Sequence, residues 1–274
     1  MEFLNNTKEI NKTDISITQR SRDYWEKRAK TYTDINKEEL VGSTRDAWLN
    51  TLKRHVIDNF KDIAPKDIKV LDIGTGPGFM AIIAALEGFN VSAVDFSESM
   101  LAEASLNIKN EGLPDNAVKL FKADAHDTGF SLESFDVIFT RNLTWNLQDP
   151  VKAYKEWYRI LKKGGILLNY DANWYSYLYD KNQRLAYEID RKNVRQHSLK
   201  DKWIGDNFDE CEDIARNIVL SRIHRPEWDL KILKKIGFID CYADTDIWKK
   251  LWSEDKKINF ASTPLFEIKA KKQM

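Results

Sequence analysis

The fold is decided by the stretch Val70-Leu71-Asp72-Ile73-Gly74-Thr75-Gly76-Pro77-Gly78-Phe79, in which an apolar run meets three glycines at alternating positions. Glycines permit a tight turn, and the residues that follow have the apolar spacing of a helix. Doubly wound sheets bind nucleotides at the turn between their first strand and first helix. The dinucleotide fingerprint would need glycine at position 79, where this chain has Phe79. The loop is of the G-x-G-x-G type, and Asp72 before it favours a ligand with a cationic end.

Short β-rich runs alternate with longer helix-compatible stretches around this loop. Such alternation predicts right-handed crossovers and a mostly parallel sheet with helices on both faces. The expected strands are residues 68–73, 90–95, 117–123, 135–140, 165–170 and 265–270. The expected helices are residues 79–88, 97–111, 150–162 and 226–236. We therefore expect an α/β fold with a doubly wound sheet.

Two flanking regions differ in composition from this core. Residues 16–62 have helical spacing and an unusual aromatic content, so we expect residues 1–62 to form a helical lid segment. Residues 172–225 are polar, rich in Tyr and Arg, and helical in character. An insertion at this point of an α/β domain is a natural specificity element, so we expect a substrate cap there. Residues 63–274 form the main domain in this interpretation.

Composition excludes several classes of protein. The 274 residues include 43 Lys+Arg and 43 Asp+Glu, which argues against an unselective nucleic-acid binder. No apolar run approaches the ~20 residues that a membrane span needs. The N-terminus lacks a signal-peptide core, so we expect a cytoplasmic protein. The two cysteines, Cys211 and Cys241, form no CxxC pair, and the four histidines are dispersed, so we expect no metal site.

Two carboxylates follow strands at the same edge of the expected sheet. Asp95 ends the second strand, about 20 residues after the glycine loop, which is the usual distance for an acid that holds ribose hydroxyls. Asp124 follows the third strand. A carboxylate after a buried apolar strand needs a polar partner, so Asp95 is the firmest of these assignments.

Together these motifs resemble the class I S-adenosylmethionine-dependent methyltransferases of the small-molecule type, which include the ubiquinone and menaquinone biosynthesis enzymes. The resemblance covers about residues 68–239, where five elements occur in order, including Leu161-Lys162-Lys163-Gly164-Gly165 and Gly237-Phe238. It implies a Rossmann-like, seven-stranded sheet and S-adenosylmethionine as cofactor, with S-adenosylhomocysteine as product. In this family the main domain, residues 63–274, would be the cofactor-binding methyltransferase domain.

The resemblance also implies cofactor contacts for particular residues of this chain. Asp72 and the backbone of the three glycines would hold the methionine part, Asp95 the ribose, and Asp124 with Ala125 the adenine amino group. Aromatic side chains near the sulfonium would attract it through cation–π interaction. The full set of expected cofactor residues is Tyr24, Asp72, Gly74, Gly76, Gly78, Asp95, Phe96, Met100, Asp124, Ala125, Arg141 and Asn142.

The acceptor is expected to be a small molecule. The Asn/Asp-Pro-Pro-aromatic motif of amino-methylating DNA enzymes is absent after the fourth strand, where the chain reads Thr140-Arg141-Asn142-Leu143. No nucleic acid and no membrane partner is expected, and the protein is expected to be a monomer or homodimer. Substrate groups gather after the fourth and fifth strands in this fold, so the expected pocket residues are Trp145, Asp171, Asn173 and Tyr175.

Two other functional classes stay open from the sequence. A nicotinamide-dependent oxidoreductase would share the sheet and Asp95, although Phe79 and Asp72 oppose it. A non-catalytic, cofactor-binding regulatory protein would keep the glycine loop and lose the acceptor pocket. The acceptor atom, whether oxygen, nitrogen, sulfur or carbon, and any catalytic base are not indicated by the sequence.

Overall fold

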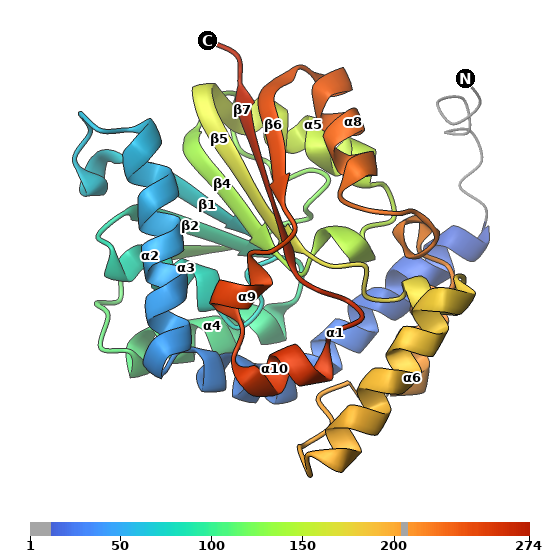
Figure 1. Ribbon diagram of the computed structural model, residues 1–274. Helices are drawn as coiled ribbons and strands as arrows, with labels where there is room; N and C mark the ends of the chain where they lie inside the picture. The colour runs from blue at the N-terminus through green and yellow to red at the C-terminus, as the bar shows by residue number, and fades with distance from the viewer. Residues whose placement is uncertain (1–11, 204–207) are drawn as a thin grey trace.

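The computed structural model of the chain describes residues 12–203 and 208–274 (Figure 1). Residues 1–11 of the expected lid segment and residues 204–207 of the expected cap lie outside the described residues. Within the described part, one sheet forms the centre of the molecule and helices surround it. No helix in these ranges combines the length and the apolar character that crossing a bilayer requires.

The sheet has seven strands in the described residues, in the order β3-β2-β1-β4-β5-β7-β6. Strands β1 to β5 are parallel, and β7 runs antiparallel to both of its neighbours. Their bounds are β1 (Lys69–Ile73), β2 (Asn90–Asp95), β3 (Val118–Lys122), β4 (Phe135–Arg141), β5 (Leu161–Asp171), β6 (Phe238–Asp244) and β7 (Phe266–Lys272). This arrangement confirms the expected α/β, Rossmann-like fold class.

One strand was not among those that the apolar runs predict. Most of β6 is exposed or half-buried, because it forms the edge of the sheet next to β7. An edge strand needs no continuous apolar run, so its sequence carries little of the signal that identifies the buried strands.

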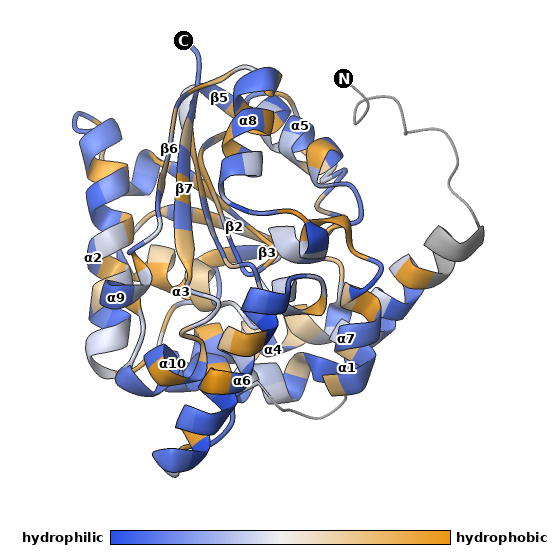
Figure 2. Ribbon diagram, turned by 45° about the vertical axis from the view of Figure 1, so that its right-hand side comes forward, coloured by the Kyte–Doolittle hydropathy of each residue, from blue (hydrophilic) through white to orange (hydrophobic). Residues whose placement is uncertain are grey.

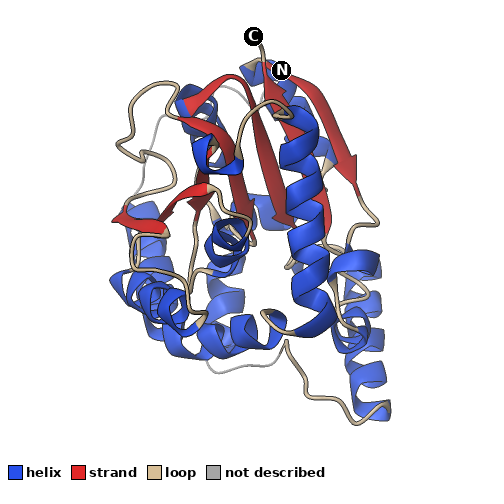
Figure 3. Ribbon diagram, turned by 90° about the vertical axis from the view of Figure 1, so that its left-hand side faces the viewer, coloured by secondary structure: helices blue, strands red, loops and turns tan. Residues whose placement is uncertain are grey.

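Helices cover both faces of the sheet, as Figure 3 shows. Alternating side chains on β4 explain why: Val137 and Phe139 pack into the core beneath one set of helices, and Ile138 packs into the core on the opposite face. The first set is α2 (Gly42–Asn59), α3 (Phe79–Leu86), α4 (Glu98–Asn110) and α9 (Trp248–Leu251). The opposite set is α5 (Pro150–Ile160) and α8 (Glu227–Ile236). Figure 2 shows the hydrophobic residues concentrated in the strands between these layers.

Local sequence signals set the ends of these helices. The Ser97 hydroxyl accepts a hydrogen bond from the Met100 amide at 3.0 Å and caps α4. Asp149 caps α5 in the same way through the Lys152 amide at 2.8 Å. Helix α8 ends at Gly237, which has the left-handed conformation common at helix ends.

Except for α2, which covers one face of the sheet, the flanking regions lie beyond the carboxyl ends of the parallel strands (Figure 1). Helix α1 (Lys12–Glu39) packs against α4 and against α7 (Phe208–Ala215). The insertion also contains η3 (Ser176–Leu178), α6 (Lys181–Gln196) and η4 (Val219–Arg222), and α6 packs against α10 (Glu254–Asn259). Each described part of residues 172–225 is therefore helical or irregular, as its composition predicts.

A buried arginine joins the end of the sheet to the insertion. The guanidinium of Arg225 donates hydrogen bonds to Asp171 at 2.7 Å and to Asp229 at 2.8 Å, and all three side chains are fully buried. The Tyr154 hydroxyl donates to Asp229, and the Trp145 amide donates to Asp171 at 2.8 Å. This network holds the end of β5, the turn after β4 and the start of α8 in one arrangement.

Replacing Arg225 tests the network, because Arg225→Met would leave two buried carboxylates without a counter-charge. Breaking one side of a buried ion pair typically costs about 3–5 kcal/mol, so we expect the free energy of unfolding to fall by that amount in urea titration. Arg184→Met is the matched control, since its pair with Glu188 is about half exposed. The control should change the free energy of unfolding by less than about 0.5 kcal/mol. Equal stability of the two variants would contradict this account.

Candidate functional site

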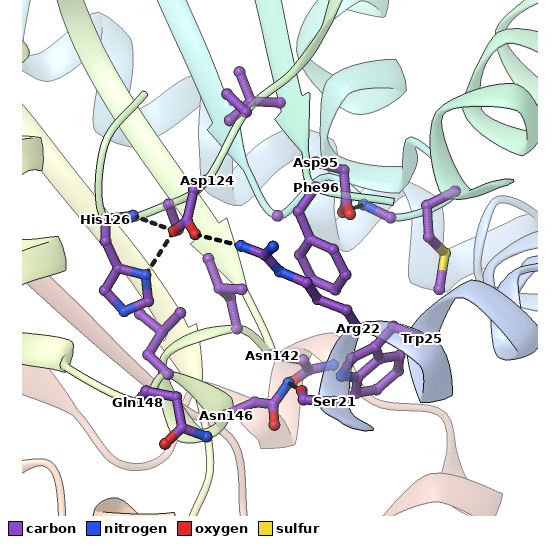
Figure 4. Close-up of a pocket in the computed structure, with 18 of the residues that line it drawn as sticks. Ser21, Arg22, Trp25, Asp95, Phe96, Asp124, His126, Asn142, Asn146 and Gln148 are labelled. Carbon is purple, nitrogen blue, oxygen red and sulfur yellow. Dashed lines mark hydrogen bonds and ion pairs between the residues drawn. The ribbon is translucent and has the colours of Figure 1, made fainter. Parts of the chain in front are cut away.

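Two cavities lie side by side at the carboxyl ends of the parallel strands. The first has a volume of about 890 Å³ and the second about 900 Å³. Helix α1 and the residues after β1 to β4 line the first cavity, which Figure 4 shows. The second lies between α1, α10 and the insertion. Four residues line both cavities and form a shared wall: Trp25, Tyr32, Arg141 and Asn142.

The glycine loop forms one side of the first cavity. Gly76 has a φ of +52°, and a Cβ there would point toward Tyr32, 3.8 Å from its ring, so glycine keeps the cavity open at this point. Gly78 has a φ of +92°, and a Cβ there would lie 3.1 Å from the Cβ of Ala104 on α4. Gly74 and Gly76 line the cavity, whereas Gly78 lets α3 begin and pack closely on α4.

Asp72 lies beneath the loop and not in the cavity. It is buried, and its carboxylate accepts hydrogen bonds from the Thr75 hydroxyl at 2.6 Å and the Ala81 amide at 3.1 Å. Burial raises the pKa of Asp72 to about 7. The expected direct contact of Asp72 with a ligand is therefore corrected: its carboxylate holds the turn and the start of α3.

Asp95 lines the first cavity and fixes the loop at the same time. Its carboxylate accepts hydrogen bonds from the Gly76 amide at 2.9 Å and the Ser97 amide at 3.0 Å. Each bond uses a different oxygen, so both oxygens keep a lone pair for a further donor. Burial raises the pKa of Asp95 to about 6. Phe96 and Met100 line the same cavity beside it.

Asp124 and Ala125 line the opposite part of the first cavity. Asp124 accepts hydrogen bonds from the His126 ring at 2.6 Å and from the Arg22 guanidinium at 3.0 Å (Figure 4). The bond from His126 is the main reason why the pKa of Asp124 lies well below its usual range. Arg22 extends from α1 to a point 6.0 Å from the centre of the Phe96 ring. Helix α1 thus closes this side of the cavity.

Several polar atoms of the first cavity are buried and have no hydrogen-bond partner among the described residues. They are Asn142 Oδ1, Asn146 Oδ1 and Gln148 Nε2. Asn142 also has a φ of +55°, a left-handed conformation that side chains other than glycine adopt at a cost of about 1–3 kcal/mol. Its amide donates to the Tyr170 carbonyl at 2.8 Å, which holds it in this conformation. Such atoms need a hydrogen-bond partner, which a bound ligand or an ordered water can supply.

Arg141 reaches the shared wall from the end of β4. Its guanidinium forms a buried ion pair with Glu39 of α1 and lies 4.3 Å from the centre of the Phe79 ring. Lys256 of α10 pairs with the same carboxylate. Burial alone would raise the pKa of Glu39, but the charges of Arg141 and Lys256 lower it to about 2. Glu39 therefore ties α1 to the sheet and to α10.

The second cavity has largely aromatic walls. The rings of Trp145 and Tyr175 lie 5.0 Å apart, and those of Trp25 and Trp145 lie 6.4 Å apart. Tyr24 lines this cavity and not the first, where we expected it. The Tyr175 hydroxyl donates to the buried Cys211 sulfur at 2.9 Å, and burial raises the pKa of that thiol. Trp145 and Tyr175, two of the four residues predicted to bind the substrate, both line this cavity.

Asp171 and Asn173 do not line the second cavity. The Asp171 carboxylate forms the buried ion pair with Arg225 described above. The Asn173 side chain donates to the Arg225 carbonyl at 2.8 Å and accepts from its amide at 3.2 Å. No sequence pattern predicts that Arg225 contacts these two residues, because Arg225 lies at the far end of the insertion. The expected substrate contact of these two residues is therefore corrected to a structural role.

The second cavity also contains lining residues that the sequence analysis did not identify. On α1, the spacing of Tyr24, Arg28, Tyr32 and Ile35 places them on one helical face, which was a usable signal. The others come from the end of the chain or from the insertion, and no local pattern marks them: Lys202, Trp203, Phe208, Lys256 and Phe260.

Known proteins with similar sequences and folds agree with this geometry. Residues 71–169 match the family described as "Methyltransferase domain". A ubiquinone/menaquinone biosynthesis C-methyltransferase of Marinomonas sp. (strain MWYL1) is 28% identical over 75% of this chain and 77% of its own length. A sterol methyltransferase-like protein of Botryococcus braunii is 28% identical over 72% of this chain and 57% of its length.

A solved structure shows the same fold. Phosphoethanolamine N-methyltransferase 2 of Haemonchus contortus, in complex with S-adenosyl-L-methionine, superposes with a TM-score of 0.55 at 22% identity. The match covers 81% of this chain and 52% of that one. The chain spans between about a third and somewhat over half of the length of the first curated relatives that it matches. Residues 71–169 thus match a methyltransferase domain family, and the chain shares its fold with a solved methyltransferase structure.

Proposed function

We propose that this protein transfers the methyl group of S-adenosylmethionine to a small-molecule acceptor. The observation that carries the proposal is the wall shared by the two cavities. The first cavity contains the family's cofactor motifs, and the second adjoins it at Trp25, Tyr32, Arg141 and Asn142. Two substrates bound in adjoining cavities meet at such a wall, which is the arrangement that a group transfer between them needs.

The residues of the first cavity fit the cofactor. Asp95 would hold the ribose hydroxyls with its remaining lone pairs, and Phe96 and Met100 would contact the adenine. Asp124 and Ala125 would lie at the adenine amino group. The loop backbone at Gly74 and Gly76, with Arg141 and Asn142, would hold the methionine part. When bound, the cofactor supplies an electrophilic methyl group, which bonds to an acceptor lone pair while the carbon–sulfur electrons return to sulfur.

The side chains of the chain itself would position the acceptor and exclude water. None of the described lining residues of the second cavity is Asp, Glu or His, the usual general bases. The raised pKa of Tyr24 and Tyr175, caused first by burial, opposes their use as bases near neutral pH. Catalysis would therefore rest on orientation and on the low-polarity aromatic walls, and the acceptor would enter with an available lone pair.

The competing functions lack comparable support. A nicotinamide-dependent oxidoreductase would need the third glycine of its fingerprint, and Phe79 at that position is buried in the core. A non-catalytic cofactor-binding protein would need no second cavity. The 900 Å³ space beside the cofactor motifs favours an enzyme with an acceptor.

Cofactor binding provides the first test. S-adenosylhomocysteine should bind the full chain in isothermal calorimetry, and NADH should not. Asp95→Ala should weaken binding by about 1.5–3 kcal/mol, the range for hydrogen bonds to a charged group. Asp115→Ala, at an exposed position, is the control and should bind like the original chain. Binding of NADH in place of S-adenosylhomocysteine would refute the proposal.

The pH dependence of that binding tests the role of Asp95 more narrowly. Its raised pKa, about 6, means that it is largely protonated at pH 5 and ionised at pH 8. Because the ionised form accepts the ribose hydrogen bonds, affinity for S-adenosylhomocysteine should increase from pH 5 to pH 7 and then level off. Asp95→Asn should bind weakly at every pH and lose this dependence. A dependence that survives in Asp95→Asn would assign the titration to another group.

The proposed lid, the N-terminal helical segment, is tested by hydrogen exchange. Trp25 and Tyr32 line both cavities, so bound ligand would pack against this part of α1. We expect exchange of the amides of residues 24–32 to slow when S-adenosylhomocysteine is added, while α6 amides, which lie away from the first cavity, serve as the internal reference. Unchanged protection of residues 24–32 at saturating ligand would show that α1 is a static wall.

A further inference from the structure

We propose that the acceptor is a small organic anion with a flat apolar body, and that Lys202 and Lys256 bind its anionic group. This inference rests on the proposed function, because it names the substrate class for the same second cavity. It follows from three properties of that cavity: its charges, its walls, and the position of the two lysines relative to the shared wall.

The charges around the second cavity leave a positive excess. Arg141, Lys202 and Lys256 all line it, and no described lining residue is acidic. Behind them, Glu39 pairs with both Arg141 and Lys256, and Glu38 pairs with Lys202 at 2.6 Å. Arg28 lines the cavity as well, so the lining has four cationic side chains, three of which pair with these two carboxylates. Glu38 is about half exposed, so solvent screens its contribution.

Because the two lysines are largely buried, keeping this excess positive charge costs free energy when no ligand is bound. The Lys256 side chain is 10% exposed and that of Lys202 is 18% exposed. Burial lowers the pKa of Lys256, and the charges of Arg141 and Lys202 lower it further against the opposing effect of Glu39. A buried cation is stabilised by a charged hydrogen-bond partner, so an anion at this point would relieve the repulsion.

The walls fit a flat, apolar body between these charges and the cofactor cavity. The ring centres of Trp174 and Trp203 are 5.9 Å apart, and those of Trp203 and Phe260 are 5.7 Å apart. These rings pack against one another at interplanar angles of 43° and 55°, and together they give the cavity an aromatic wall that a flat aromatic or unsaturated body can pack against. Trp174 lines the cavity, and its buried indole N–H has no hydrogen-bond partner among the described residues. It is available to an oxygen of the acceptor.

The position of the lysines orients the acceptor. Lys202 and Lys256 line the second cavity alone, whereas Tyr32 and Asn142 line both cavities. An acceptor with its anionic group at the lysines would therefore direct its other end toward the shared wall, where the methyl group would arrive. A cationic acceptor in the same place would meet like charges on three sides.

Binding of matched probes to the full chain tests the proposal. Phenylacetate, 2-phenylethanol and phenethylamine share a phenyl ring and differ in charge, and phenyl phosphate provides a second type of anion. Titrations followed by tryptophan fluorescence, with and without S-adenosylhomocysteine, should show at least one anion binding about tenfold more tightly than the alcohol and the amine. The order of the two anions distinguishes a carboxylate acceptor from a phosphate acceptor.

Variants of the two lysines then locate the anion. Lys202→Met and Lys256→Met should each weaken anion binding by about fivefold or more and change S-adenosylhomocysteine affinity by less than about twofold. Lys257→Met is the matched control on α10, because Lys257 pairs with the exposed Glu254 and does not line the cavity. Lys202→Met keeps the test valid if the buried Lys256→Met fails to fold.

Each outcome of these titrations is decisive. Equal binding of the alcohol or the amine, no binding of either anion at millimolar concentration, or full anion affinity in Lys202→Met would overturn the proposal. If S-adenosylhomocysteine binds and the anion preference is absent, the acceptor class is wrong and the proposed function stands. If S-adenosylhomocysteine itself fails to bind, the proposed function fails, whatever the probes do.

Discussion

The hydrogen bond from the Gly76 amide to the Asp95 carboxylate, 2.9 Å long, is the constraint on which the site depends. It joins the glycine loop after β1 to the end of β2, and the Ser97 amide on the other carboxylate oxygen continues the link to α4. Because the parallel strands end at one edge, a single buried carboxylate both shapes the loop and faces the cavity that the loop encloses. The amide hydrogen bonds to both oxygens compensate for the burial of the Asp95 carboxylate.

Helix α1 lines both cavities at this edge of the sheet. It is anchored by Glu39, whose buried carboxylate binds Arg141 from the sheet and Lys256 from α10. Arg22 on the same helix reaches Asp124 at the other side of the first cavity. The two anchors differ in strength, because the Glu39 cluster is buried while Arg22 and Asp124 are each roughly half exposed. An enclosure with one firm and one weak attachment is suited to opening for ligands at the weaker side.

The sequence predicted the core of the fold and nine of the 21 residues that line the first cavity, because those features are local. A glycine loop, an acid after a buried strand and an N-cap such as Ser97 are each determined by a few adjacent residues, so their positions could be derived without the structure. The predictions that were wrong concern features that depend on residues far apart in the sequence. The structural roles of Asp171 and Asn173 depend on Arg225, and the charge of the second cavity depends on Lys202 and Lys256, partners that only the folded chain brings together. Edge strand β6 was missed because its exposure removes the apolar signal.

A crystal structure of the full chain with S-adenosylhomocysteine would test the central claim most directly, namely that the two cavities hold a methyl donor and its acceptor on either side of one wall. The account predicts ribose hydroxyls on Asp95 and the ligand sulfur directed at the wall formed by Trp25, Tyr32, Arg141 and Asn142, facing the aromatic second cavity. A sulfur directed away from the second cavity, or a ligand bound outside the first, would contradict it.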